Sequence, residues 1–187
     1  MFFKKSHNDE PGELDRAMAE LHKGSLDAFK ILYEKYNRKV YRFCLRILED
    51  QALAEDAFQE TFIKVYEHRK DFRGENFQSW LFTIARHTCL NFIRAKKTHD
   101  SIDDDFQASY EISHTDFGMK DFIKNAVGKL PLALREALIL REYEECSYQE
   151  IAEILSIDLS LAKVRVHRAR LLLKKLLKPI EKEYYES

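Results

Sequence analysis

Residues 146–178 constrain the fold of this chain most, because their capping residues and apolar spacing predict two helices joined by a short turn. Ser147 can cap the first helix, and Glu150, three residues later, completes a capping box. The helical pattern is then interrupted at residues 156–158. Two residues can cap the second helix, Asp158 and Ser160.

The second of these helices combines one apolar stripe with charge of a single sign. Small or apolar residues repeat at helical spacing, at Ala162, Val166, Ala169 and Leu173. The rest of the segment holds seven basic residues and no acidic one, namely Lys163, Arg165, Arg168, Arg170, Lys174, Lys175 and Lys178. A short helix, a turn and a cationic second helix fit the major groove of DNA. A solvated helix pair is the alternative, but the one-signed charge favours DNA binding.

The composition of the chain favours an all-α fold in one domain or two small ones. The 187 residues include only 5 glycines and 3 prolines, and no long alternating strand pattern appears. The net charge of −1 argues against a uniformly basic surface, so the charge must be segregated along the chain. No apolar run approaches the roughly 20 residues of a membrane span, and residues 1–13 lack a signal-peptide core. We therefore expect a cytoplasmic protein.

The chain offers little for catalysis or for metal binding. Cys44, Cys89 and Cys146 lie far apart without paired spacing, so buried free thiols are expected rather than a zinc site or disulfides. No glycine-rich phosphate loop and no nucleophile–histidine arrangement is recognisable. We therefore predict a protein that is not an enzyme and that has no cofactor and no metal.

The first half of the chain begins with helices that carry recognisable caps. A short helix is expected at 14–22, with Gly24 ending it, and Ser25 and Asp50 can cap the two helices that follow. Five acids fall within twelve residues around the second cap, namely Glu49, Asp50, Glu55, Asp56 and Glu60. This anionic patch serves either solubility or the docking of a basic partner.

Residues 77–97 predict one long helix without any acidic residue. Trp80 belongs to the expected core face, whereas basic and polar residues are left for the outside. A basic helix with aromatic residues and a polar loop at its start suits single-stranded or melted nucleic acid, because aromatic rings stack on bases while cations track phosphates.

The pattern breaks at residues 98–118, which hold six acids and no lysine or arginine. This stretch is predicted to be an acidic flexible linker between helical domains at 14–97 and 119–178. It could hold the two basic surfaces off DNA, occupy a cationic channel or act as a solubilising spacer. Helices are expected at 119–130 and from Pro131 onward, where the missing N–H costs nothing.

Three motifs in this order resemble the sigma-70 family of RNA polymerase sigma factors, within its extracytoplasmic-function (ECF) group. LAEDAFQETFIKVY at 53–66 is similar to the region 2 helix that docks on the polymerase β′ clamp. NFQSWLFTIARHTCLNFIR at 76–94 resembles the segment that reads the promoter −10 element. The stretch 130–173 resembles region 4, which binds the −35 element. The likeness covers nearly everything except the linker and the two ends.

The resemblance implies a role for particular residues. Contacts to the polymerase clamp are implied for Asp56, Gln59 and Glu60. Contacts to melted −10 DNA are implied for Arg73, Asn76, Phe77, Gln78, Arg86, His87, Asn91 and Arg94. Contacts to −35 duplex are implied for Ser160, Lys163, Val164, Arg165, His167, Arg168 and Arg170. The implied partners are core RNA polymerase (β′ clamp and β flap), promoter DNA and an anti-sigma factor, with the acidic linker in the RNA path of the polymerase.

Several positions depart from the family pattern. His87 and Asn91 stand where Asn and Asp are common, and Ser156 replaces the usual turn glycine. Val164 occupies a position that is often polar, where it either touches a thymine methyl or packs against a neighbouring helix. Two other classes remain at this point: a dimeric helix-turn-helix repressor or activator, and a helical interaction protein that never starts transcription.

Overall fold

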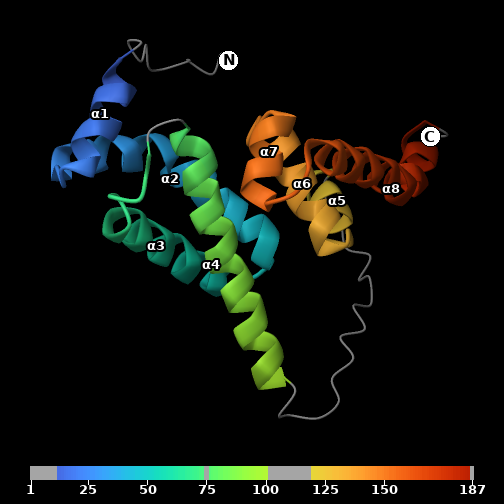
Figure 1. The fold of residues 1–187 in the computed structure, drawn as a ribbon. Coiled ribbons are helices and arrows are strands. Elements are labelled where there is room, and N and C mark those ends of the chain that lie inside the picture. Colours follow the sequence, from blue (N-terminus) through green and yellow to red (C-terminus); the bar gives the residue numbers. More distant parts are fainter. Residues whose placement is uncertain (1–11, 74–75, 101–118, 186–187) are drawn as a thin grey trace, which may run out of the picture.

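The computed structural model describes residues 12–73, 76–100 and 119–185, and in these ranges the chain forms eight helices and no strand. The helices are α1 (Glu13–His22), α2 (Leu26–Leu48), α3 (Gln51–Glu67), α4 (Phe77–Asp100), α5 (Met119–Gly128), α6 (Leu132–Glu142), α7 (Tyr148–Leu155) and α8 (Leu159–Tyr185). Figure 1 shows α1–α4 beside α5–α8, and these two groups of helices are called the first and the second domain below. The all-α prediction is confirmed, and residues 101–118 of the expected linker lie outside the described residues.

Three of the predicted helix starts are confirmed by their capping hydrogen bonds. The Ser25 side chain accepts from the Ala28 N–H at 3.3 Å, and Asp50 accepts from the Leu53 N–H at 3.1 Å. At the start of α7, Ser147 Oγ accepts from the Glu150 N–H while the Glu150 carboxylate accepts from the Ser147 N–H. The capping box is therefore complete, and it fixes where the helix-turn-helix begins.

In the turn between α7 and α8, serine occupies a left-handed backbone position where the family pattern usually has glycine. Ser156 has φ 53°, and the Ile157 N–H bonds back to the carbonyl of Ala152. Of the two candidate caps, Asp158 directly precedes α8, and its carbonyl accepts from the Ala162 N–H. Ser160 instead lies in the first turn of α8, where its side chain is exposed.

Several helix boundaries differ from the sequence predictions, and α5, predicted to end at residue 130, ends at Gly128. The α4 backbone continues to Asp100, because residues 98–100 contain no helix breaker. Pro131 is the N-cap of α6 rather than its first helical residue, and its carbonyl accepts from Leu134 and Arg135. The α8 backbone runs to Tyr185, past Pro179.

The core of the first domain is built around α4, which packs against α2 and α3 on one side and against α7 on another. Phe82 is fully buried and meets Phe43 of α2 edge-on, with 5.3 Å between ring centroids.

All three cysteines are buried and free, as predicted, and burial raises the pKa of Cys146 to about 11. Within the described ranges, no helix has an apolar stretch suited to crossing a membrane.

Candidate nucleic-acid interface

The outward face of α8 presents most of the residues predicted to contact −35 duplex. Ala162, Val166 and Ala169 are fully buried and fix the orientation of the helix. The exposed predicted residues are Ser160, Lys163, Val164, His167, Arg168 and Arg170, whereas Arg165 on the flank is partly buried. Val164 is 41% exposed, so it lies on the outward face rather than in a helix–helix contact.

Arg170 differs from its neighbours on α8 because it has a carboxylate partner. Its Nε and Nη2 donate to Glu142 Oε1 of α6 at 2.8 and 2.6 Å, and this bond raises the pKa of Arg170. The pair ties the middle of α8 to α6. Arg170 is therefore positioned by the domain, whereas Lys163, His167 and Arg168 extend toward solvent.

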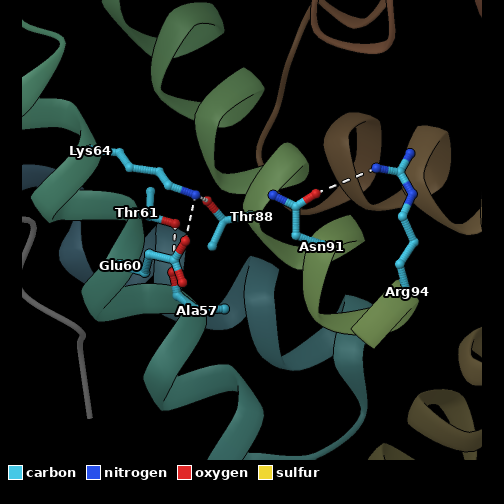
Figure 2. Close-up of polar contacts among 7 residues, drawn as sticks. All are labelled: Ala57, Glu60, Thr61, Lys64, Thr88, Asn91 and Arg94. Atoms are coloured by element: carbon cyan, nitrogen blue, oxygen red, sulfur yellow. Dashed lines mark hydrogen bonds and ion pairs between the residues drawn. The ribbon is translucent and has the colours of Figure 1, made fainter. Parts of the chain in front are cut away.

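The C-terminal half of α4 presents a second polar surface. His87, Asn91 and Arg94 are exposed there, and Arg94 Nη1 donates to Asn91 Oδ1 at 3.4 Å, as Figure 2 shows. Partial burial, together with Arg86 and Arg94, lowers the pKa of His87. Arg73, in the loop before α4, is also exposed. Four of the eight predicted −10 residues are thus open to solvent.

Three further predicted −10 residues are instead bonded to the second domain. Asn76 caps α4 with its Oδ1, which accepts from the Ser79 N–H, and its Nδ2 donates to Glu150 Oε1 at 2.7 Å. Gln78 Nε2 donates to the carbonyl of Glu144 at 3.1 Å. The third residue, Arg86, donates to Glu136 of α6. The N-terminal half of α4 is therefore covered by the segment that leads into α7 and by α7 itself.

Arg86 forms the most buried ion pair between the two domains. Its Nε donates to Glu136 Oε1 of α6 at 2.8 Å, and the Glu136 side chain is only 4% exposed. Sequence reasoning missed Glu136, because a single glutamate on an apolar helix reads as a solvent-facing residue. Its partner lies 50 positions earlier in the chain and becomes apparent only after folding.

Phe77 is the one predicted −10 contact that the structure corrects. Its side chain is 3% exposed and packs among the rings of Tyr36, Phe72 and Trp80, with centroid distances of 5.5 to 5.8 Å. A ring held on three sides by other rings has no face left for a base. Phe77 therefore anchors the start of α4 in the core, while Trp80, predicted to be core, is partly buried beside it.

The interface between the domains continues along α2. Arg135 of α6 pairs with the carboxylate of Glu49, which lies so close to Gly128 that a Cβ there would collide with it. Arg46 lies 3.9 Å from Glu144 and, through its guanidinium, 3.9 Å from the centroid of the Tyr143 ring. Three pairs of oppositely charged side chains thus lie in this contact, alongside the amide hydrogen bonds of Asn76 and Gln78.

Glu144 makes this contact sensitive to pH. Burial raises the pKa of its carboxyl from 4.5 to about 7, despite the cations Arg46, Lys39 and Arg42 around it and with Glu145 as an acidic neighbour. A carboxyl whose folded pKa is raised stabilises the packed state below its unfolded pKa and loses that contribution as pH rises through the folded value. The relevant window therefore lies between pH 4.5 and about 7.

We accordingly expect the protein to gain stability relative to Glu144→Gln as the pH falls from 8 to 5. The raised pKa corresponds to at most about 3.5 kcal/mol, since one pKa unit is about 1.4 kcal/mol. Thermal unfolding of both proteins at several pH values measures the difference, and Glu145→Gln serves as the exposed control. A melting-temperature difference between wild type and Glu144→Gln that does not change with pH would contradict the assignment.

On α3, an exposed apolar residue follows the acidic and polar residues that were predicted to contact the polymerase. Asp56 and Gln59 are exposed, and Glu60 pairs with Lys64 at 2.5 Å, while Lys64 also reaches Thr88 Oγ1 of α4 (Figure 2). Ile63, one turn beyond Gln59, is 57% exposed. Sequence reasoning missed Ile63, although its helical spacing from Asp56 and Gln59 was a usable signal.

No group of side chains within the described ranges is arranged to hold a metal ion.

Comparison with known proteins identifies the class to which this fold and these surfaces belong. Residues 32–99 match Sigma-70 region 2, and residues 123–173 match Sigma-70, region 4. The RNA polymerase sigma-H factor of Pseudomonas aeruginosa is 31% identical over 91% of this chain and 97% of its own length. The ECF RNA polymerase sigma factor SigM of Bacillus subtilis is 33% identical over 78% of this chain and 92% of its own.

Solved structures agree with this assignment. The sigma factor RpoE of Bartonella quintana, solved in complex with the anti-sigma factor NepR, has a TM-score of 0.72 and 29% identity over 82% of this chain and 98% of its own. CnrH, solved with the cytosolic domain of CnrY, shares the fold at a TM-score of 0.70. The chain therefore belongs to the ECF group of the sigma-70 family. Sigma factors are non-enzymatic initiation factors that bind core RNA polymerase and direct it to promoters.

Proposed function

We propose that three surfaces of this chain divide the work of promoter-specific initiation. The anionic face of α3 docks on the polymerase β′ clamp, the exposed side of α4 with Arg73 contacts melted −10 DNA, and the outward face of α8 reads −35 duplex. The observation that carries this proposal is the cationic face of α8, which is exposed opposite a fully buried stripe. Two modest DNA surfaces on one scaffold reinforce each other through effective concentration.

The test is run-off transcription with bacterial core RNA polymerase on a library of genomic promoter fragments, with and without this protein. We expect transcripts that depend on the protein and that share an upstream pair of −35 and −10 elements. Such transcripts would also reveal both recognition sequences. Binding to core without any transcript would favour a decoy, and binding to duplex DNA without core would favour a repressor.

Ile63 is expected to anchor the contact with the clamp. An exposed isoleucine beside acidic and polar side chains of the same helix is a candidate interface hot spot, where truncation costs about 1–2 kcal/mol. Ile63→Ala should weaken binding to core polymerase by about tenfold, measured by fluorescence anisotropy of labelled protein. The control is Leu26→Ala, because Leu26 of α2 is also an aliphatic residue whose side chain is largely exposed. Equal losses in both variants would argue against a specific role for Ile63.

A second apolar surface lies between α6 and α8. The groove has a volume of about 410 Å³ and is lined by Leu138, Glu142, Arg170, Leu173, Lys174 and Leu177. Its aliphatic floor and charged rim suit a short amphipathic helix, and we assign it to the polymerase β flap. An anti-sigma factor is a further partner that this proposal includes, because RpoE of Bartonella quintana was solved in complex with the anti-sigma factor NepR. The site of action is the cytoplasm, where core polymerase works.

A further inference from the structure

The outward face of α8 carries apolar side chains among its cations. Leu161 is 39% exposed and Val164 is 41% exposed, and the exposed Lys163 and Arg168 lie beside them. Both apolar residues fall in the first two turns of α8, which begins at Leu159. Other residues of the helix supply its contribution to the core, namely Ala162, Val166 and Ala169, with Leu172, Leu173 and Leu176 packed against them. Leu161 and Val164 are therefore available to a partner.

We propose that Leu161 and Val164 set the −35 specificity of this chain by contacting the C5-methyl groups of thymines in the major groove. The inference rests on the proposed −35 role of α8 and adds the base that two of its side chains select. Charge complementarity favours duplex DNA as the occupant of this face, because Lys163 and Arg168 beside the apolar pair suit phosphate groups. An apolar protein surface would leave the same cations without partners.

The lack of polar atoms in these two side chains determines which base they favour. In the major groove every base edge presents hydrogen-bond donors or acceptors, and thymine adds an apolar methyl group. An aliphatic side chain that faces a purine edge or the cytosine amino group displaces water from polar atoms without returning a hydrogen bond, which costs free energy. Against a thymine methyl, the same side chain buries apolar surface on both partners, and burial of one methyl is worth about fourfold in affinity.

Helix geometry places the two contacts on neighbouring base pairs. Three residues of an α-helix advance about 4.5 Å along its axis, which is close to the roughly 3.4 Å between stacked base pairs. The N-terminal residues of a recognition helix are the ones that reach base edges, and Leu161 and Val164 belong to them. Leu171 is 56% exposed on the same helix, but it lies about 18 Å along the axis from the first residue of α8. It is therefore a matched control.

The test replaces thymine by deoxyuridine, which removes the C5-methyl group and leaves every hydrogen-bonding atom in place. The template is a synthetic promoter that the protein transcribes with core RNA polymerase, and each thymine of its −35 element is replaced in turn on either strand. Run-off transcription at limiting protein concentration measures the contribution of each methyl group. For the wild type we expect a loss of about fourfold at each of two adjacent base pairs, and little change elsewhere in the element.

Variants of the full-length protein connect each methyl group to one side chain. Val164→Ala should transcribe the unmodified promoter less well and lose its response to deoxyuridine at one of the two positions, since the contact is already gone. Leu161→Ala should do the same at the adjacent position, whereas Leu171→Ala should respond as the wild type does. Alanine has the highest helix propensity, so these exposed substitutions preserve α8, and circular dichroism verifies the helical content.

A promoter with a scrambled −35 element separates failure of the inference from failure of the proposed function. If scrambling abolishes transcription but no single deoxyuridine affects the wild type, the inference is overturned and the −35 role of α8 stands. A methyl effect that persists undiminished in both Val164→Ala and Leu161→Ala would also overturn the inference. Transcription that survives scrambling would refute the −35 role of α8, and the inference with it.

Discussion

Phe82→Ala is expected to lower the free energy of unfolding by about 3–5 kcal/mol, the cost typical of deleting a buried aromatic ring. Phe82 is fully buried and packs edge-on against Phe43 at the point where α2 and α4 meet. Because α4 is held by α2, α3 and α7, the surrounding backbone cannot collapse into the vacated volume. The loss would be a large part of the 5–15 kcal/mol that stabilises a typical domain.

Urea unfolding followed by circular dichroism measures this effect. Phe92→Ala is the matched control, because Phe92 lies on the same helix but is only partly buried. We expect a clearly smaller loss for Phe92→Ala, together with an unchanged dependence of unfolding free energy on urea concentration. Equal losses in the two variants would mean that the Phe43–Phe82 contact is not the centre of this core.

Local chemistry made the helix starts predictable from the sequence. Ser25, Asp50 and Ser147 each bond to a backbone N–H three residues later, and such contacts depend only on neighbouring residues. The buried stripe of α8 was predictable for the same reason, since Ala162, Val166 and Ala169 follow from helical spacing. The exposed charges on α8 then follow by elimination.

The interface between the domains could not be predicted in this way. One apolar stripe was assigned to the helix at 77–97, yet α4 is covered on two sides and buries Phe77 and Phe82 in addition. Glutamates such as Glu136 and Glu144 are usually surface residues, but here each is buried beside an arginine that is distant in the sequence. Tertiary partners decide the burial of such groups, and periodicity carries no information about them.

The candidate site was predictable to the extent that it depends on exposure alone. Asp56, Gln59 and Arg168 are exposed where the motifs imply partner contacts. Asn76 and Gln78 are polar residues that have found partners within the chain, which no motif indicates. The first group is exposed and the second is hydrogen-bonded within the chain, which shows that the N-terminal half of α4 is covered.

The outward face of α8 distinguishes two arginines that the sequence treats alike. Arg168 is exposed, one turn beyond Val164 and away from the buried stripe, whereas Arg165 lies on the flank and is partly buried. A side chain at the centre of the outward face reaches base edges when the helix enters the major groove. A side chain on the flank reaches the phosphate backbone instead.

Arg168→Ala is therefore expected to reduce −35-dependent transcription roughly 5- to 150-fold, the effect of losing about 1–3 kcal/mol at a base contact. Arg165→Ala should cause a smaller loss that is nearly independent of the −35 sequence, because phosphate contacts carry no base information. Run-off transcription on promoters with intact and with scrambled −35 elements separates the two effects, and Lys124→Ala on α5 is the control for lost charge. Both variants should bind core polymerase as the wild type does. Loss of core binding in Arg168→Ala, or an equal loss of transcription on both promoters, would show that α8 does not read the −35 element through this residue.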